Sequence, residues 1–234
     1  MKYRILDLFC GAGGFSSGFE QNTNFKTLIA VDFDQNATNT FKNNFPDSEV
    51  ICGDISNIDI KKQIIKKSKD VNINMIIGGP PCQGYSLKGK KIGFDDQRNF
   101  LFLEYFDIVK NISPQIFIIE NVKNLLNAQK GYFIKQIYQM FTDLGYKVSY
   151  GVLNAKNFGI PQNRERAIII GCKDKEILLP KSNIDKHISV YDAISDLNFL
   201  CSGEGSFQSE YLYNPLSSYQ KNLRGDKLYL NFPL

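Results

Sequence analysis

Short apolar runs alternate with amphipathic stretches along most of the chain. The runs are rich in β-branched residues, which favour strands, and the stretches between them repeat apolar residues at helical spacing. We predict strands at Tyr3–Leu8, Thr27–Val31, Glu49–Cys52, Met75–Ile77 and Ile116–Ile119. We predict helices at Phe15–Glu20, Ala37–Phe45, Ile60–Lys67, Leu101–Lys110 and Tyr132–Leu144. This alternation predicts an α/β fold with a mostly parallel sheet and helices on both of its faces.

Two further strands, Lys147–Leu153 and Arg166–Gly171, flank a polar loop with no long helix between them. Strands joined in this way pair antiparallel, so we predict an antiparallel pair at one edge of the sheet.

The pattern loosens after about Pro180, although Val190–Leu197 still has the spacing of a helix. The stretch Tyr211–Leu234 has aromatic and basic residues without a clear period. We therefore divide the chain into a main domain at residues 1–180 and a less regular segment at residues 181–234.

Composition excludes several classes of protein. The chain has 234 residues, of which 43% are hydrophobic and 22% charged, enough for a sizeable core. It contains neither a membrane-spanning apolar run nor a signal peptide, so we expect a cytoplasmic protein. One histidine and five cysteines without a CxxC pair argue against a metal site and against a Ser-His-Asp triad. The net charge of +4 permits nucleic-acid binding without requiring it.

A glycine-rich turn, DLFCGAGGFS from Asp7 to Ser16, follows the first strand and opens the first helix. Glycines at this position allow a sharp turn and a close approach of the backbone to a ligand. The spacing is not the GxGxxG of dinucleotide-binding proteins, and no phosphate-binding lysine follows it. The turn therefore favours a nucleoside-like ligand other than a dinucleotide or a nucleoside triphosphate.

Two acidic residues at strand ends specify this ligand further. Asp32 ends the second strand, where its carboxylate can accept hydrogen bonds from a ribose diol, and Phe33 can lie against an adenine ring. Asp54 follows the third strand and can accept from the adenine amino group. The alternative is structural, because Asp54 or Ser56 could simply cap the next helix. The combination favours an adenosine site.

Cys82 lies in GGPPCQGYS, which begins where the fourth strand ends. Two prolines stiffen the approach to this cysteine, and the strand end places it beside the expected cofactor crevice. The alternative is that Cys82 is a small buried hydrophobic residue, as many intracellular cysteines are.

Four segments together resemble the DNA (cytosine-5) methyltransferases of bacterial restriction-modification systems. In chain order they are DLFCGAGGFSSGF, GGPPCQGYS, ENV at Glu120–Val122 and QNRERAIIIG at Gln162–Gly171. The resemblance runs from about Ile5 to Gly171, with weaker similarity at 190–197 and 219–224. It implies a Rossmann-like S-adenosylmethionine-dependent fold, S-adenosylhomocysteine as product, double-stranded DNA as partner, and no metal. It implies cofactor contacts at Phe9, Gly11, Gly13, Gly14, Phe15, Asp32, Phe33, Asp54, Ile55 and Pro80.

The resemblance also assigns catalytic roles. Cys82 is the thiolate that adds to carbon 6 of cytosine, which makes carbon 5 nucleophilic enough to accept a methyl group. Glu120 lies at the ring nitrogen, and Arg166 donates to the cytosine carbonyl oxygen. Arg164 supports the Cys82 side of the site. The alternative for Glu120 and the arginines is an ordinary ion-pair network.

A cytosine inside a duplex must be flipped out before a thiol can reach it. The segment Gln83–Asn99 suits a loop that closes over DNA, because it combines glycines with basic residues. We expect DNA contacts at Gln83, Ser86, Lys88, Lys90, Lys91 and Arg98. The alternative is a solvated surface loop with incidental lysines.

Complete members of this family continue into a target-recognition domain and end with a segment that contains Gly-Asn. This chain contains no Gly-Asn dipeptide and reaches Leu234 near where that domain begins in relatives. We expect a fragment, or one subunit of a split enzyme whose second polypeptide carries the recognition domain. Either case predicts exposed apolar surface and weak activity of the isolated chain.

Two other functions stay open. A tRNA cytosine-5 methyltransferase shares the same catalytic set, but relatives of that kind carry a Cys-Phe-Thr segment that is absent here. The other alternative is a non-catalytic subunit that binds the cofactor or DNA without turnover.

Overall fold

The computed structural model describes residues 2–81, 100–182, 184–206, 208–225 and 229–231. The chain forms two compact units. The first comprises Met1–Leu153 and Glu165–Pro180, and the second comprises Asn154–Arg164 and Lys181–Leu234. Residues 154–164, which sequence analysis placed in the main domain, therefore group with the second unit.

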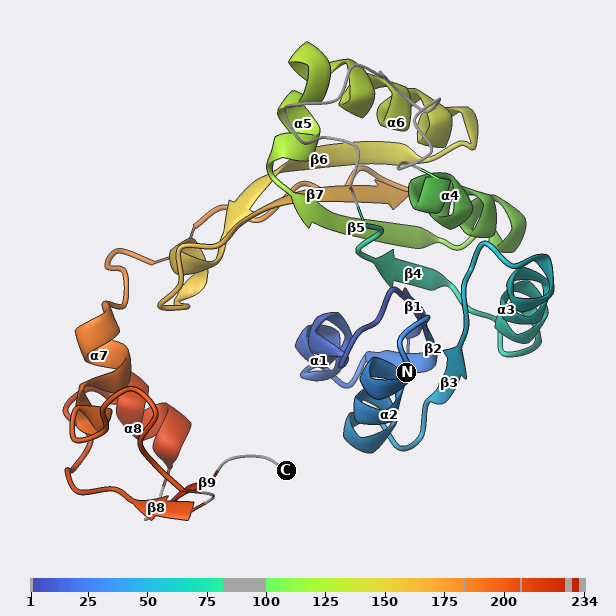
Figure 1. The fold of residues 1–234 in the computed structure, drawn as a ribbon. Coiled ribbons are helices and arrows are strands. Elements are labelled where there is room, and N and C mark those ends of the chain that lie inside the picture. The colour runs from blue at the N-terminus through green and yellow to red at the C-terminus, as the bar shows by residue number, and fades with distance from the viewer. Residues whose placement is uncertain (1, 82–99, 183, 207, 226–228, 232–234) are drawn as a thin grey trace. The chain divides into compact units, whose positions relative to one another are not determined.

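A seven-stranded mixed sheet in the order β3-β2-β1-β4-β5-β7-β6 forms the centre of the first unit (Figure 1). The strands are β1 (Tyr3–Leu8), β2 (Phe25–Asp32), β3 (Glu49–Cys52), β4 (Met75–Gly78), β5 (Ile116–Val122), β6 (Lys147–Asn154) and β7 (Glu165–Cys172). Strands β1 to β5 pair in parallel, whereas β7 runs antiparallel to β5. The predicted fold class, with its mixed edge, is confirmed.

Both faces of the sheet are buried at its central strands β1 and β4. Successive residues of a strand point to opposite sides, so each of these strands contributes to two apolar clusters. In β1, Ile5 belongs to one apolar cluster and Leu6 to another, and Met75 and Ile76 divide in the same way in β4. This is why the strands read as continuous apolar runs in the sequence.

Helices cover the two faces unequally (Figure 1). The side chains of α1 (Gly14–Glu20) and α2 (Gln35–Asn44) join the clusters on one face. The opposite face is covered by α3 (Ile58–Asp70), α4 (Phe100–Ile112), α5 (Asn124–Asn127) and α6 (Tyr132–Asp143), and a 3-10 turn η3 (Ala128–Gly131) joins the last two. None of the described helices is long and apolar enough to cross a membrane.

Two helices begin slightly before their predicted starts because polar residues cap them. The Asp34 side chain accepts hydrogen bonds from the backbone N–H groups of Asn36 and Ala37 at the start of α2. Asn57 does the same for Asp59 and Ile60 at the start of α3. An apolar pattern locates the buried face of a helix, whereas the cap decides where the helix begins.

The second unit contains short elements. They are η4 (Ala155–Phe158), α7 (Val190–Ile194), η5 (Ser195–Leu197), β8 (Gln208–Glu210), α8 (Ser218–Arg224) and β9 (Tyr229–Asn231). The predicted helix 190–197 is thus an α-helix followed by a 3-10 turn, and α8 was not predicted. In α8 the buried residue is Gln220, whose amide donates to the Tyr191 carbonyl and the Ser195 hydroxyl. A polar anchor of this kind leaves no apolar period in the sequence.

Candidate active site at the carboxyl edge of the sheet

The carboxyl ends of β1 to β5 lie along one edge of the sheet, because these strands are parallel. Strand β1 lies between β2 and β4, so the chain crosses to opposite sides of β1 as it forms the sheet. In open α/β sheets, ligands bind outside the carboxyl ends of the strands at such a switch point. The predicted glycine turn follows β1 and lies at this point.

The glycine turn has an unusual backbone. Phe9, Gly11 and Gly13 all have positive φ angles, of 60°, 53° and 95°. A Cβ at residue 13 would overlap the Phe45 ring and lie 3.0 Å from Phe41. At residue 11 a Cβ would meet nothing within 4 Å. Gly13 is therefore required by packing, whereas Gly11 is required by its conformation and faces open space.

The Asp32 carboxylate holds this turn in place. One of its oxygens accepts from the Gly11 backbone N–H at 2.9 Å, and the other accepts from the Asp34 N–H at 3.0 Å. Each carboxylate oxygen has two lone pairs, so acceptor capacity for a ribose diol is still present. Asp32, at the end of β2, thus holds the glycine turn and is also the proposed acceptor for a ribose.

A cleft of ≈240 Å³ opens beside the turn. It is lined by Phe9, Phe33, Gly53, Asp54, Ile55, Pro81 and Leu101. The Phe33 ring is 75% exposed, which is unusual for a phenylalanine next to a packed core and leaves its face accessible to an aromatic ligand.

Asp54 does not start the helix that follows it. Its Oδ1 accepts from the Ser56 N–H at 2.8 Å, while Asn57 caps α3. Neither Asp54 nor Ser56 therefore caps α3, and the Asp54 hydrogen bond forms a local turn instead. Asp54 lies in the wall of the cleft, where its carboxylate can accept a hydrogen bond from a ligand.

Other expected cofactor residues lie differently. Gly14 is the exposed first residue of α1, and Phe15 packs beside Phe19 against the sheet, with ring centroids 5.6 Å apart. Pro80 is buried, and the neighbouring Pro81 lines the cleft. Leu101 also lines the cleft, and sequence reasoning missed it because it reads as an ordinary apolar position of α4.

Glu120 and Arg166 form an ion pair on adjacent strands. Arg166 lies opposite Val122 in the antiparallel register of β5 and β7, and its Nε is 2.8 Å from Glu120 Oε1. The two side chains are 30% and 28% exposed, so both reach the surface at this edge. A Cβ on Gly79 would lie 3.4 Å from Glu120 Oε2, so the glycine keeps space beside the carboxylate.

Asn121 connects the end of β5 to the turn after β4. Its Nδ2 donates to the Pro80 carbonyl at 2.8 Å, and its Oδ1 accepts from the Val122 N–H at 2.9 Å. Asn121 is buried and was not among the predicted site residues. Its place between Glu120 and Val122 was the available signal, since a polar residue interrupts an apolar strand there.

Several predicted residues lie outside the described part of the structure. These are Cys82, Gln83, Ser86, Lys88, Lys90, Lys91 and Arg98. Arg164 belongs to the second unit, where its carbonyl accepts from the Ala155 N–H at 3.0 Å. Cys10 lies in the glycine turn, but burial raises the pKa of its thiol well above the ordinary value. Cys10 is therefore a poor nucleophile despite its position.

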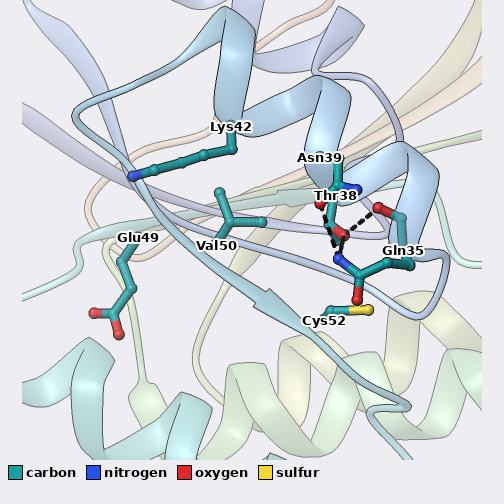
Figure 2. A pocket seen from close by; sticks show the side chains of 7 residues that line it. All are labelled: Gln35, Thr38, Asn39, Lys42, Glu49, Val50 and Cys52. Atoms are coloured by element: carbon teal, nitrogen blue, oxygen red, sulfur yellow. Dashed lines mark hydrogen bonds between the residues drawn. The ribbon is translucent and has the colours of Figure 1, made fainter.

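A second groove of ≈350 Å³ lies between α2 and the edge strand β3 (Figure 2). Its polar groups are engaged within the protein: the Gln35 amide donates to Thr38 and Asn39, and Lys42 Nζ donates to the carbonyls of Pro46 and Ser48. None of its lining residues was predicted to bind a ligand. The smaller cleft at the strand ends is the better candidate site.

Comparison with known proteins identifies the family of the chain. The family of C-5 cytosine-specific DNA methylases matches residues 3–227. The Type II methyltransferase M.DdeI of Desulfomicrobium norvegicum is 38% identical over 230 residues, covering 94% of this chain and 54% of that protein. M.AquIA of Picosynechococcus sp. is 42% identical over 182 residues, covering 73% of this chain and 72% of that protein.

A solved structure is similar as well. It is described as a DNA modification methyltransferase encoded within an Escherichia coli prophage, with a TM-score of 0.74 and 27% identity. The match covers 95% of this chain and 64% of that one. The chain thus spans about half the length of most of the curated relatives that it matches. By sequence and by fold, the chain belongs to the C-5 cytosine-specific DNA methylase family.

Proposed function

We propose that the protein transfers a methyl group to carbon 5 of a flipped-out cytosine in DNA, as part of a bacterial restriction-modification system. The observation that carries the proposal is the Glu120–Arg166 pair, which lies at the same sheet edge as the cleft. Family membership supports the reaction class. In the bacterial cytoplasm, such an enzyme marks host DNA.

The cleft residues fit S-adenosylmethionine, which supplies an electrophilic methyl group and leaves as S-adenosylhomocysteine. Phe33 stacks on the adenine, and Asp54 accepts from its amino group. Asp32 accepts from the ribose hydroxyls with the lone pairs that Gly11 and Asp34 leave over. An aromatic face and one carboxylate in an otherwise apolar wall, with the Asp32 carboxylate at the neighbouring strand end, suit an adenosine.

Cys82 is the nucleophile of the proposed reaction. Its thiolate forms a bond to carbon 6, and the displaced electron pair makes carbon 5 nucleophilic. Carbon 5 takes the methyl group. Loss of the carbon-5 proton then returns an electron pair to the ring, and the bond from carbon 6 to sulfur breaks.

Glu120 and Arg166 bind the cytosine in this proposal. The Glu120 carboxyl group faces the ring nitrogen and the exocyclic amine, and the Arg166 guanidinium donates to the carbonyl oxygen. Their mutual 2.8 Å contact keeps both groups in position before the base arrives. Arg164 supports the Cys82 side, and metal is not required in these steps.

The flipped base requires contacts to the DNA backbone as well. We assign these contacts to the segment that follows Cys82. Its residues Gln83, Ser86, Lys88, Lys90, Lys91 and Arg98 supply hydrogen-bond donors and positive charge for phosphates.

We further propose that a second polypeptide completes the enzyme. Large apolar side chains are exposed in the second unit, at Val190, Tyr191, Ile194, Leu212, Leu216 and Leu223. These exposed apolar side chains support a protein interface on the second unit.

A mechanism-based trap tests the reaction. The purified chain is incubated with S-adenosylmethionine and double-stranded DNA of mixed sequence that contains 5-fluorocytosine. Fluorine at carbon 5 cannot leave as a proton does, so a methylated adduct stays bound to the nucleophile and survives a denaturing gel. We expect an adduct that is absent in Cys82→Ser.

Cys201→Ser is the matched control, because Cys201 is exposed and lies in the second unit. An adduct that persists in Cys82→Ser would contradict the assigned nucleophile. Should the chain alone give no adduct, the trap is repeated with lysate of the source cell. Efficient methylation by the purified chain alone would contradict the proposal that a second polypeptide completes the enzyme.

A further inference from the structure

Helix α1 begins without the side chain that normally caps a helix. Its N-cap residue is Gly13, which has no side-chain cap hydrogen bond. The first N–H groups of a helix lack partners within the helix, so a cap or another acceptor must satisfy them. A capping residue at position 13 is excluded here, because its Cβ would overlap the Phe45 ring.

A carboxylate of strand β1 contacts the start of α1 instead. Ser16, three residues after the N-cap, donates its hydroxyl to Asp7 Oδ2 at 2.7 Å. The Thr27 hydroxyl of β2 donates to Ser16 Oγ at 2.9 Å. All three side chains are fully or almost fully buried. This chain of hydrogen bonds ties β1, α1 and β2 together.

We propose that Asp7 is a positioning residue that anchors the start of α1 from inside the protein through Ser16 and thereby fixes the glycine turn of the cofactor site. The idea rests on the proposed function of that turn. Asp7 reaches α1 from the side of the sheet, so the turn itself carries no capping side chain. The outer side of the turn, where a Cβ on Gly11 would meet nothing, stays open.

The turn is thus held from two sides. Asp7 binds Ser16 at the start of α1, and Asp32 binds the Gly11 N–H at 2.9 Å. Between them, the Gly13 N–H donates to the Cys10 carbonyl and the Ser17 N–H to the Gly13 carbonyl. Asn44 Nδ2 also donates to the Ala12 carbonyl at 2.9 Å. Loss of the Asp7–Ser16 contact removes the anchor between β1 and α1, and the glycine-rich turn then depends on the remaining contacts.

Cofactor binding tests this role in the full chain. Titration calorimetry with S-adenosylhomocysteine is compared for the unsubstituted protein, Ser16→Ala, Asp7→Asn and Ser68→Ala. We expect Ser16→Ala to weaken binding about tenfold. Asp7→Asn keeps an oxygen acceptor for Ser16 and should stay within about threefold. Ser68 is an equally buried serine on α3 whose hydroxyl lacks a partner among the described residues, so Ser68→Ala should change nothing.

Hydrogen exchange gives a readout that needs no cofactor. Amides of residues 9–17 should exchange about tenfold faster in Ser16→Ala than in the unsubstituted protein, with the sheet amides unchanged. Equal exchange and equal affinity in Ser16→Ala would overturn the proposal. A chain that binds no S-adenosylhomocysteine would instead contradict the proposed function, and exchange alone would then decide the role of Asp7.

Discussion

Asn121 Nδ2 donates a 2.8 Å hydrogen bond to the carbonyl oxygen of Pro80. The bond joins the end of β5, which carries Glu120, to the turn that leads from β4 to Cys82. Residues far apart in sequence are thereby held in one register at the proposed catalytic edge. The bond is buried, so breaking it would leave the Pro80 carbonyl without this donor, which costs free energy.

Asn121→Asp should slow adduct formation with 5-fluorocytosine DNA by about tenfold or more, since the variant keeps its shape but loses the donor. Affinity for S-adenosylhomocysteine should be unchanged, because other side chains line the cleft. Asn74→Asp is the control: Asn74 Nδ2 also donates to a backbone carbonyl, that of Lys2, but just before the start of β4. Equal slowing in both variants would argue against a specific role for Asn121.

Glu120→Gln separates catalysis from stability. The Glu120–Arg166 pair is about one third exposed, so its loss should lower the free energy of unfolding by less than about 1 kcal/mol. Adduct formation should fall about a hundredfold or more, because the amide cannot share the proton of the cytosine ring nitrogen as a carboxyl group does. Urea unfolding and the trap measure the two effects. A large loss of stability with normal trapping would support the ordinary ion pair instead.

Phe33→Ala should weaken S-adenosylhomocysteine binding about tenfold while leaving the unfolding midpoint nearly unchanged. The ring is 75% exposed, so it contributes little to the core but offers a full stacking face. Leu178→Ala removes a side chain that is 74% exposed and lies outside the cleft. Calorimetry should find no effect of that change. Comparable losses of affinity in both variants would remove Phe33 from the site.

Burial of the Asp7 carboxyl group predicts that the stability of the protein depends on pH. Burial raises the pKa of this group from 3.8 to about 7, against the lowering effect of the Ser16 hydrogen bonds. Between these values the folded protein keeps a proton that the unfolded chain has released. The free energy of unfolding should therefore fall as pH rises from about 4 to about 7, by on the order of 4 kcal/mol, and then level off.

Asp7→Asn should lack this part of the pH dependence. Urea unfolding of both proteins between pH 5 and pH 8 gives the difference in stability at each pH. We expect the variant to gain stability relative to the unsubstituted protein as pH rises. The buried amide itself changes the free energy of unfolding by an amount that does not depend on pH. A difference that does not vary with pH would show that the Asp7 carboxyl group does not titrate in this range.

The sequence by itself determined the sheet and most of its helices. The strands Tyr3–Leu8 and Glu49–Cys52 were predicted with their observed bounds. For Tyr3–Leu8 the signal is a mostly apolar run, because residues buried on both faces of a parallel sheet are apolar. The sequence also placed Asp32, Asp54 and Glu120 at or near strand ends. Parallel strands bring such ends to one edge, so that local pattern and topology together located the candidate site.

Only the tertiary structure decided which side chains meet there. Leu101 enters the cleft while Phe15 packs against the sheet, although both read as ordinary apolar positions of a helix. Asn121 meets Pro80 across 41 positions of the chain, and Asp7 accepts from Ser16 at the start of the following helix. Periodicity records only which face of an element is buried. Contacts between elements depend on how those elements pack, which no local pattern contains.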